Sequence, residues 1–342
     1  MPDIKTRILI LSDTHNQPGI TLPNLPVDVA IHCGDLTSRS QIHEFHSAIS
    51  LLKKINARLK LVIAGNHDYT LDAPFFWNQL APSLAEKAAP ELIVEKYGNP
   101  GEARQLFNSY SPEIVFLDEG IHRFSLSNGA DLKVYASPFT PSRGPHWTLG
   151  FQYLPDQYHG FAITKGAVDI VITHGPPLGV LDEIIPSARK YPPHVGCKHL
   201  LKAIAQARPR LHCFGHIHEG WGAKLVTWRR DNIASGNDGG PDYEGAIDQD
   251  ATITTETLDT LLPSQQDSPE VASERQRRLM AFWTDGYRYA SHCANDPHPL
   301  TPGRNTLFAN AAIQPSHKDT RNGGLQLPWI VDIELPATST TP

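Results

Sequence analysis

The sequence predicts a layered α/β fold, and three observations support this prediction. Short apolar, β-branched runs recur along the chain and are bounded by Gly, Pro or polar residues, as is typical of buried strands. Helical patterns lie between several of these runs. The chain has 342 residues, of which 40% are hydrophobic, so it is long enough to bury a large core. Strands that alternate with helices favour a fold in which helices cover a sheet.

Five predicted strands share a further property, because each is followed directly by a polar cluster. The strands are predicted at 8–11, 27–31, 61–64, 168–173 and 211–214. The clusters that follow them are Ser12-Asp13-Thr14-His15, His32-Cys33-Gly34-Asp35, Gly65-Asn66-His67-Asp68, His174-Gly175-Pro176-Pro177 and Gly215-His216-Ile217-His218. In open α/β sheets, ligands bind beyond the carboxyl ends of the strands. All five clusters occupy that kind of position.

Two helices are predicted between these strands. Residues 41–55 place Phe45 and Ile49 on one apolar face, and residues 198–207 place Ile204 inward. Both helices therefore predict a layer packed against a sheet.

The segment 229–303 differs in composition from the rest of the chain. Its first part is rich in Gly, Asp and Asn, and a helix is predicted from the N-cap Ser268 to Trp283. We interpret this segment as an insertion within a single domain that covers residues 1–342. After it, the sequence predicts two strands and a disordered tail, at 306–309, 329–335 and 336–342.

Composition excludes several classes of protein. The formal net charge of −6 argues against binding long nucleic acid through a broad basic face. No apolar run approaches the roughly 18 residues that span a bilayer, and the first run is shorter than a secretory signal requires. The four cysteines form no C-x-x-C pair, which argues against a zinc ribbon and fits a reduced, intracellular protein. We therefore expect a cytoplasmic protein that does not bind membranes.

The polar clusters are weak signals singly, because each also fits an ordinary turn. The element Gly215-His216-Ile217-His218 is the strongest of them, and its alternative interpretation is a surface histidine pair. Together the clusters predict a metal site. The seven candidate ligands are Asp13, His15, Asp35, Asn66, His174, His216 and His218.

The residue types of this set indicate its chemistry. Imidazole and carboxylate suit ions such as Zn, Mn and Fe. An aspartate can bridge two ions, and two ions about 3.5–4 Å apart can bind both free oxygens of a phosphate ester. Because the ions bring more positive charge than the two carboxylates offset, the site would attract an anion although the protein is acidic.

These motifs resemble, in order and without a gap, the signature of the calcineurin-like metallophosphoesterases. The closer resemblance is to the branch called metallophosphoesterase-domain-containing proteins. It rests on 31–37, 62–67, 135–138, 173–179, 195–197 and 214–220, and on Asn310-Ala311. It covers roughly 7–222 and resumes over 305–335, and it leaves 229–303 without a counterpart.

The resemblance implies a four-layer α/β/β/α sandwich with a dinuclear metal site of Mn, Fe or Zn at one edge. It assigns Asp13, His15, Asp35 and His218 to one ion. It assigns Asp35, Asn66, His174 and His216 to the other, so that Asp35 bridges. His67 would face the phosphate and assist the leaving oxygen, while a metal-bridging hydroxide attacks phosphorus. Some members of the branch lack the histidine equivalent to His216 and are weak catalysts, whereas this chain retains it.

The expected function is metal-dependent hydrolysis of small phosphodiesters such as cyclic nucleotides. The alternatives are a phosphomonoesterase or nucleotide pyrophosphatase on the same site, or a binding or scaffold protein that keeps the fold. The types of Arg143, His146 and Trp147 suit a substrate-facing wall, and packing of their loop is the equal alternative. A further hypothesis is that the insertion caps the site. The sequence leaves the oligomeric state open.

Overall fold

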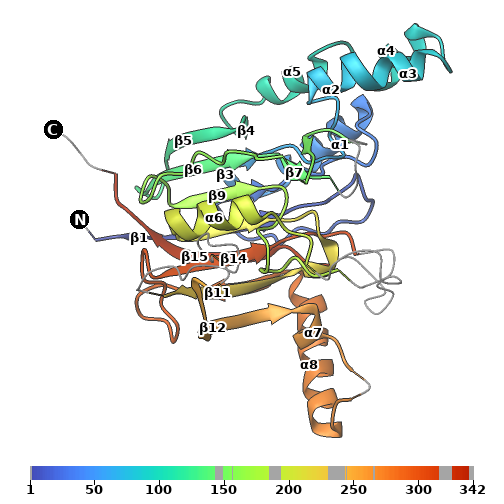
Figure 1. Ribbon diagram of the computed structural model, residues 1–342. Coiled ribbons are helices and arrows are strands. Elements are labelled where there is room, and N and C mark those ends of the chain that lie inside the picture. The colour runs from blue at the N-terminus through green and yellow to red at the C-terminus, as the bar shows by residue number, and fades with distance from the viewer. Residues whose placement is uncertain are drawn as a thin grey trace.

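The computed structural model describes residues 2–142, 149–155, 157–184, 194–229, 243, 245–264, 266–315 and 326–338. In this part of the chain the strands form two large sheets and one short two-stranded sheet, of β7 (Thr140–Pro141) and β8 (Gln152–Tyr153). The large sheets lie face to face and are flanked by helices (Figure 1). The molecule is thus a mixed α/β sandwich, as the sequence predicts.

The first sheet has six strands in the order β13-β15-β1-β2-β3-β4. These strands are β13 (Arg288–Ser291), β15 (Trp329–Leu335), β1 (Ile4–Leu11), β2 (Val27–His32), β3 (Ala57–Val62) and β4 (Ile114–Phe116). Strands β1 to β4 run parallel to one another, so the loops after β1, β2 and β3 reach the same edge.

The second sheet has seven strands in the order β12-β11-β14-β10-β9-β6-β5. These strands are β12 (Ile247–Thr257), β11 (Gly222–Trp228), β14 (Asn305–Asn310), β10 (Leu211–Phe214), β9 (Ile170–Thr173), β6 (Asp131–Ser137) and β5 (Gly120–Ser125). Its central strands β14, β10, β9 and β6 are parallel.

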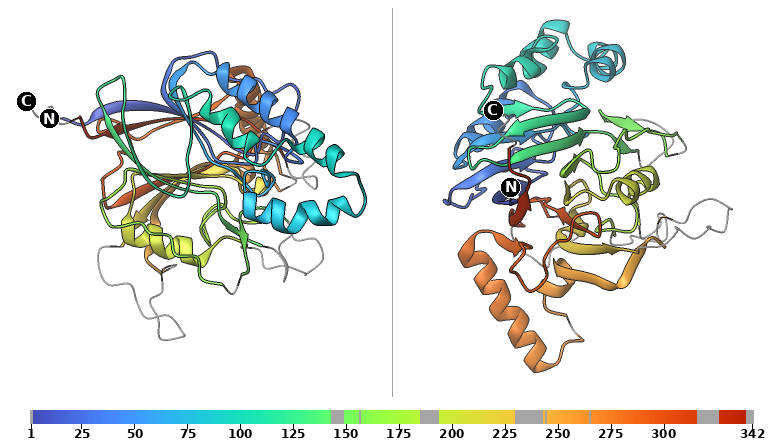
Figure 2. Two further views of the ribbon diagram at one scale, coloured as in Figure 1. Left: turned by 90° about the horizontal axis from the view of Figure 1, so that it is seen from above. Right: turned by 90° about the vertical axis from the view of Figure 1, so that its left-hand side faces the viewer.

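Alternation of side chains along the strands creates the layers. In β1, Ile8 and Ile10 belong to the core between the two sheets, whereas Leu9 and Leu11 face the helices outside. The helices over that outer face are α1 (Ile42–Lys53) and α5 (Glu102–Asn108), and α6 (Lys198–Ala207) covers the outer face of the second sheet. The order of layers is therefore α/β/β/α (Figure 2).

A small helical lobe follows β3 and has its own apolar cluster around Phe76. It consists of α2 (Ala73–Phe75), the π-helix Phe76–Leu80, α3 (Ala81–Ala85) and α4 (Pro90–Tyr97). The lobe lies above the first sheet in Figure 1. The sequence patterns used above did not predict it, because its helices are short and interrupted by Pro and polar residues.

The segment expected to be an insertion adds strands to both sheets. β12 pairs with β11 at the edge of the second sheet, and β13 pairs with β15 at the edge of the first. Between them lie α7 (Leu258–Leu261) and α8 (Pro269–Asp285), and α8 projects away from the sandwich (Figure 1).

Several predicted boundaries shift. The third strand is β3, which ends at Val62 and so leaves residues 63 and 64 to the turn before the polar cluster. Residues 336–338, which we expected to be disordered, are held near the hairpin of β5 and β6, since the Thr338 N–H donates to the Gly129 carbonyl over 2.9 Å. Residues 339–342 lie outside the described part of the chain.

Candidate metal centre

The seven candidate ligands come from both sheets and meet where the strands end. The first sheet supplies Asp13 and His15 after β1, Asp35 after β2 and Asn66 after β3. The second supplies His174 after β9, and His216 and His218 after β10. Side chains up to 205 residues apart thus become neighbours.

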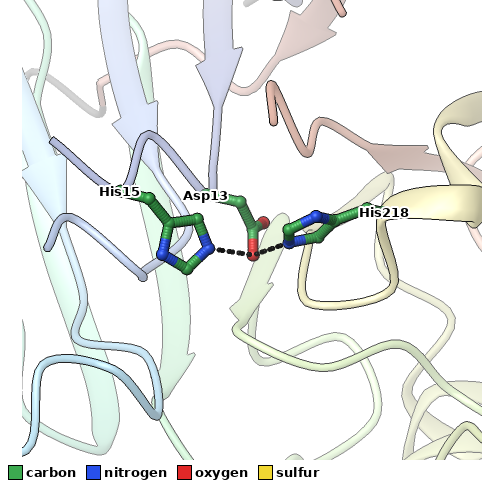
Figure 3. Close-up of side chains that lie close together, drawn as sticks. All are labelled: Asp13, His15 and His218. Atoms are coloured by element: carbon green, nitrogen blue, oxygen red, sulfur yellow. Dashed lines mark hydrogen bonds and ion pairs between the residues drawn. The ribbon is translucent and has the colours of Figure 1, made fainter. Parts of the chain in front are cut away.

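One group surrounds Asp13, which is fully buried (Figure 3). Asp13 Oδ1 lies 3.2 Å from His218 Nε2 and 3.8 Å from His15 Nε2. His15 Nε2 also lies 3.5 Å from Asp35 Oδ2. The donor atoms of Asp13, His15 and His218 all lie within 4.8 Å of one another, which is close enough to share one ion.

A second group surrounds Asp35. His174 Nε2 lies 3.4 Å from Asp35 Oδ2 and 2.9 Å from Asn66 Oδ1. The rings of His174 and His216 are 4.9 Å apart, and Asp35, His174 and His216 form another set of donor atoms within 4.8 Å. Asp35 therefore faces both groups. A third set of donor atoms shares His15 with the first group and Asp35 with the second, and it adds His67.

Backbone carbonyls fix which ring nitrogen faces the centre. His15 Nδ1 donates to the Thr37 carbonyl over 3.1 Å, and His174 Nδ1 donates to the Cys33 carbonyl over 2.9 Å. Each Nε2 is then left as the metal-binding atom in the neutral ring. His15 Nε2 is buried and has no hydrogen-bond partner among the described residues, and it faces the Asp13 and Asp35 carboxylates at 3.8 and 3.5 Å.

The carboxylates and imidazoles shift one another's pKa. Burial by itself raises the pKa of Asp13 and of Asp35, but the surrounding histidines outweigh it and hold both pKa values below the ordinary range. Burial lowers the pKa of His15 and His174, but the same two carboxylates outweigh it and raise the pKa to about 8 and about 9. The cluster thus stabilises positive charge next to the carboxylates of Asp13 and Asp35.

Unusual backbone conformations aim the ligands. Asp13, His15, Asp35 and His216 all have positive φ, between 43° and 65°, which is uncommon outside glycine. Glycine is also required nearby, since a Cβ on Gly215 would lie 1.9 Å from Asp13 Oδ2.

Two residues support the centre without facing it. His32 has its pKa lowered to about 3 by burial, and the neutral ring accepts from the Gly34 N–H and bonds to Thr14 Oγ1. Asp68 accepts the N–H groups of Gly65, Leu36 and Thr37, so it ties two ligand turns together. The role of Asp68 was not predicted from the sequence, although its place directly after His67 was an available signal.

His67 lies beside the candidate ligands, and its ring is held by a backbone carbonyl outside that set. Its Nδ1 donates to the Ser38 carbonyl over 2.9 Å, and its ring lies edge-on to that of His15 with centroids 4.8 Å apart. The candidate substrate residues Arg143, His146 and Trp147 lie outside the described residues. The described residue Gly150 contacts the site directly, because its N–H donates to the Asn66 carbonyl over 3.1 Å.

In the described part of the chain, no helix has both the length and the apolar character to cross a bilayer.

Comparisons with known proteins give several relatives. Probable rhamnogalacturonate lyase C of Emericella nidulans is 33% identical over 229 residues, covering 66% of this chain and 18% of that protein. Metallophosphoesterase domain-containing protein 1 of Homo sapiens is 32% identical over 232 residues, covering 64% of this chain and 62% of that protein. A UPF0046 protein of Caenorhabditis elegans is 28% identical and covers 63% of this chain and 52% of that protein. The chain thus spans less than two thirds of the length of these relatives.

Among solved structures, TT1561 of Thermus thermophilus aligns over 65% of this chain and 84% of that chain, with 13% identity and a TM-score of 0.35. That score is too low to carry an argument. The sequence profile described as "Calcineurin-like phosphoesterase" matches residues 6–220, which is more than half of the chain and includes every candidate ligand. The chain therefore belongs to the calcineurin-like phosphoesterase family.

Proposed function

We propose that this protein hydrolyses small phosphodiesters with two metal ions bound at the strand-end cluster. Asp13, His15, Asp35 and His218 would hold one ion, and Asp35, Asn66, His174 and His216 the other. The ions, which we expect to be Mn, Fe or Zn, would supply activation of water and neutralisation of phosphate charge. The substrate would be a small molecule, and cyclic nucleotides are the class we expect.

The observation that carries this proposal is the position of Asp35 between two groups of donor atoms. Asp35 Oδ2 lies 3.5 Å from His15 Nε2 and 3.4 Å from His174 Nε2, whereas Oδ1 accepts the His67 N–H over 2.8 Å. Oδ2 is therefore the oxygen that would be shared by the two ions. The buried His15 Nε2 supports the same proposal, because it faces the Asp13 and Asp35 carboxylates without a hydrogen bond to either, and a cation would be favoured among these three groups.

The chain's own side chains would divide the remaining work. Asn66 accepts from a ring nitrogen in the present geometry and would turn its Oδ1 toward the second ion. His67 would face the leaving oxygen with Nε2, since its Nδ1 is engaged by the Ser38 carbonyl. The Gly150 N–H donates to the Asn66 carbonyl, so the backbone at Gly150 lies against this turn.

Other activities on the same site are tested by the choice of substrates. A phosphomonoesterase or a nucleotide pyrophosphatase would use the same ions, and a scaffold protein would bind metal without turnover. The lyase name of the fungal relative belongs to a protein of which this chain covers 18%, so that activity is not extended to this chain.

The test is elemental analysis of the purified protein followed by a substrate panel. The panel contains 2′,3′- and 3′,5′-cyclic nucleotides, dinucleotides, glycerophosphodiesters, monoesters and a polynucleotide. We expect about two metal ions per chain and fastest turnover of a small diester. Turnover of monoesters alone would replace the diesterase assignment, and metal binding without any turnover would favour the scaffold.

Asp35→Asn tests the bridge directly. The variant should lose at least one ion and most of the activity, because an amide cannot bridge as a carboxylate does. Asp131→Asn is the matched control, since Asp131 is also a buried carboxylate, paired with Arg123 at the start of β6. Full metal content and activity in Asp35→Asn would contradict the ligand assignment.

A further inference from the structure

The imidazole of His67 is oriented by a backbone carbonyl and not by a carboxylate. Its Nδ1 donates to the Ser38 carbonyl over 2.9 Å. Ser38 also contacts the metal cluster, because its hydroxyl donates to the His15 carbonyl over 2.6 Å. The position of one carbonyl therefore decides how His67 faces the site.

The turn that contains Ser38 is held by one buried carboxylate from α1. Glu44 Oε1 accepts the Ser38 N–H over 3.1 Å. Glu44 Oε2 accepts the Arg39 N–H over 3.1 Å and the Gln41 N–H over 2.8 Å. Glu44 is only 5% exposed, so water cannot easily replace these three bonds.

This arrangement exceeds what helix capping requires. A capping carboxylate in the first turn needs to reach only the N-cap N–H, which here belongs to Gln41. One of the two further bonds, from the Arg39 N–H, fixes the peptide group that contains the Ser38 carbonyl, and the other, from the Ser38 N–H, fixes the peptide group before it. Ser40, next in the turn, has a φ of 53°, a conformation that the chain holds only when neighbouring contacts enforce it.

We infer that Glu44 is a positioning residue for His67 and acts through the Ser38 carbonyl. The inference rests on the proposed function, in which His67 Nε2 faces the leaving oxygen. In that step, water oxygen forms the new bond to phosphorus and loses its proton to solvent. The bond from phosphorus to the leaving oxygen breaks, and that oxygen takes a proton from His67, which later regains one from solvent.

Loss of this positioning has a distinctive kinetic result. Assistance to the leaving oxygen matters most when that oxygen is a poor leaving group and little when it is a stable anion such as p-nitrophenolate. A misplaced His67 should therefore slow alkyl phosphodiesters more than p-nitrophenyl phosphodiesters. General damage to the site would slow both classes equally.

The experiment compares Glu44→Gln with the wild-type protein, both loaded with Zn²⁺. The glutamine amide carries a donor where a backbone N–H needs an acceptor, so at least one of the three bonds is lost. We expect kcat for an alkyl phosphodiester to fall by about tenfold and kcat for the p-nitrophenyl ester by less than about twofold, with unchanged zinc content and similar KM. Glu44→Asp keeps a negative charge near the helix start but has a shorter reach, and it should show the same selectivity if Glu44→Gln is unstable.

Glu102→Gln is the matched control. Glu102, the first residue of α5, also accepts a backbone N–H just before a helix, that of Asn99 over 2.8 Å, but its bond is exposed and it lies far from His67 in the chain. It should leave both substrates unaffected. Equal losses on both substrates in Glu44→Gln, or loss of zinc, would overturn the inference.

A spectroscopic measurement keeps this inference separate from the proposed function. Long-range ¹H–¹⁵N spectra of the zinc-loaded protein report which ring nitrogen of His67 carries the proton, and the His67→Ala spectrum identifies its signals among the 17 histidines. In the wild type we expect Nδ1 to carry a proton in every form of the ring, with Nε2 also protonated in the form that donates to the leaving oxygen. In Glu44→Gln we expect the neutral ring to be a mixture of Nδ1–H and Nε2–H forms. A wild type with no turnover would reject the proposed function alone, whereas an unchanged His67 signal in Glu44→Gln would reject the positioning role.

Discussion

Individual ligand residues are held in backbone conformations that cost free energy. Positive φ at Asp13, His15, Asp35 and His216 costs about 1–3 kcal/mol at each residue, and the surrounding hydrogen bonds must offset it. The His216 N–H, for instance, donates to Asp13 Oδ2 over 2.9 Å. The turn that carries His216 is therefore fixed by another candidate ligand, Asp13.

Gly215→Ala tests how closely the two sheets approach at the site. Its methyl group would collide with Asp13 Oδ2, so we expect loss of the ion at Asp13 although every ligand is still present. Elemental analysis measures this loss. Gly160→Ala is the control, because Gly160, like Gly215, has no positive φ and its added methyl group would meet only the Tyr158 side chain, at 3.3 Å or more, so the variant should keep its metal. Retention of both ions in Gly215→Ala would show that the approach is looser than described.

His67→Ala separates chemistry from metal binding. Because His67 Nδ1 is held by Ser38 and its Nε2 is assigned to the leaving oxygen, the variant should keep both ions and lose about 10²–10⁴-fold in turnover of alkyl diesters. Metal analysis and kcat on the same preparation make the comparison. Loss of an ion would instead make His67 a ligand, as its place beside His15 and Asp35 also allows.

Metal affinity should rise with pH. The pKa values of His15 and His174 are raised from 6.5 to about 8 and about 9, so without an ion both rings are doubly protonated and positively charged near pH 7. An ion must displace these protons, and Zn²⁺ affinity should increase up to about pH 9 and level off above it. Calorimetry in buffers of different ionisation enthalpy counts the protons released. Zinc binding at pH 7 without proton release would contradict the raised pKa values.

At this scale the sequence predicts ligands better than it predicts the groups that orient them. Asp13, His174 and the pair His216 and His218 each follow an apolar run. Their residue types and their positions after predicted strands identify them as candidate ligands. The Ser38 carbonyl and the reach of Glu44 depend on how a turn folds, which residue type does not reveal. Asp68 is intermediate, since its position beside His67 was visible but its three N–H partners were not.

Among the elements, the segment predicted as an insertion closes the open edge of the sandwich. Phe282 of α8 packs edge-on against Trp221, which in turn stacks on Trp329 of β15 at 5.2 Å. Glu256 at the end of β12 is fully buried and forms ion pairs with Arg278 of α8 and Arg288 of β13. One carboxylate thus joins strand, helix and strand from the two sheets.

Glu256→Gln should destabilise this edge. Removing the charge leaves two partly buried arginines without their partner, which we expect to cost about 1.5–3 kcal/mol of the free energy of unfolding. Thermal and urea unfolding measure the change. Glu274→Gln is the matched control, because its pair with Arg277 is exposed and should contribute less than about 1 kcal/mol. Equal effects of the two variants would show that Glu256 does not join the elements as described.

The sequence indicated α8 but not its role. The cap at Ser268 and Pro269 predicts where the helix begins, since both act within one turn. Strand β12 is long and polar on its exposed positions, so its alternation is weak and its pairing with β11 could not be predicted. We expect deletion of the segment 229–303 to lower the free energy of unfolding, because it would remove edge strands from both sheets. The hypothesis that the whole segment 229–303 caps the site stays a prediction, and residues 230–242, 244 and 265 of that segment lie outside the described residues.

For the whole molecule, ions at the centre would connect the two sheets. Asp13 and Asp35 belong to the first sheet, whereas His174 and His218 belong to the second. Removing the ions with a chelator should lower the melting temperature, since ligands that bind only the folded state stabilise it by about 2.7 kcal/mol at one hundred times Kd. Scanning calorimetry with and without EDTA measures the shift, and Zn²⁺ should restore it. An unchanged melting temperature would mean that the ions do not connect the sheets.

Short local patterns predict that helices cover a sheet, and the family resemblance implies the four layers, whereas the neighbours within each sheet could not be predicted. Alternation in β1 separates Ile8 from Leu9 and thereby assigns them to different sides of a sheet. The placement of β15 between β13 and β1 depends on contacts between distant segments, for which a single sequence contains no local signal.

That placement of β15 has a consequence for how the chain folds. Arg7 on β1 pairs with Asp332 on β15 across 325 residues of sequence, and β15 is an interior strand of its sheet. Contacts of such long separation slow folding, because much of the loop-closure entropy is lost before they form. During synthesis, every proposed ligand leaves the ribosome before β15, the strand that completes the first sheet. If the ligands come together at that stage, β15 must still insert between β13 and β1 afterwards.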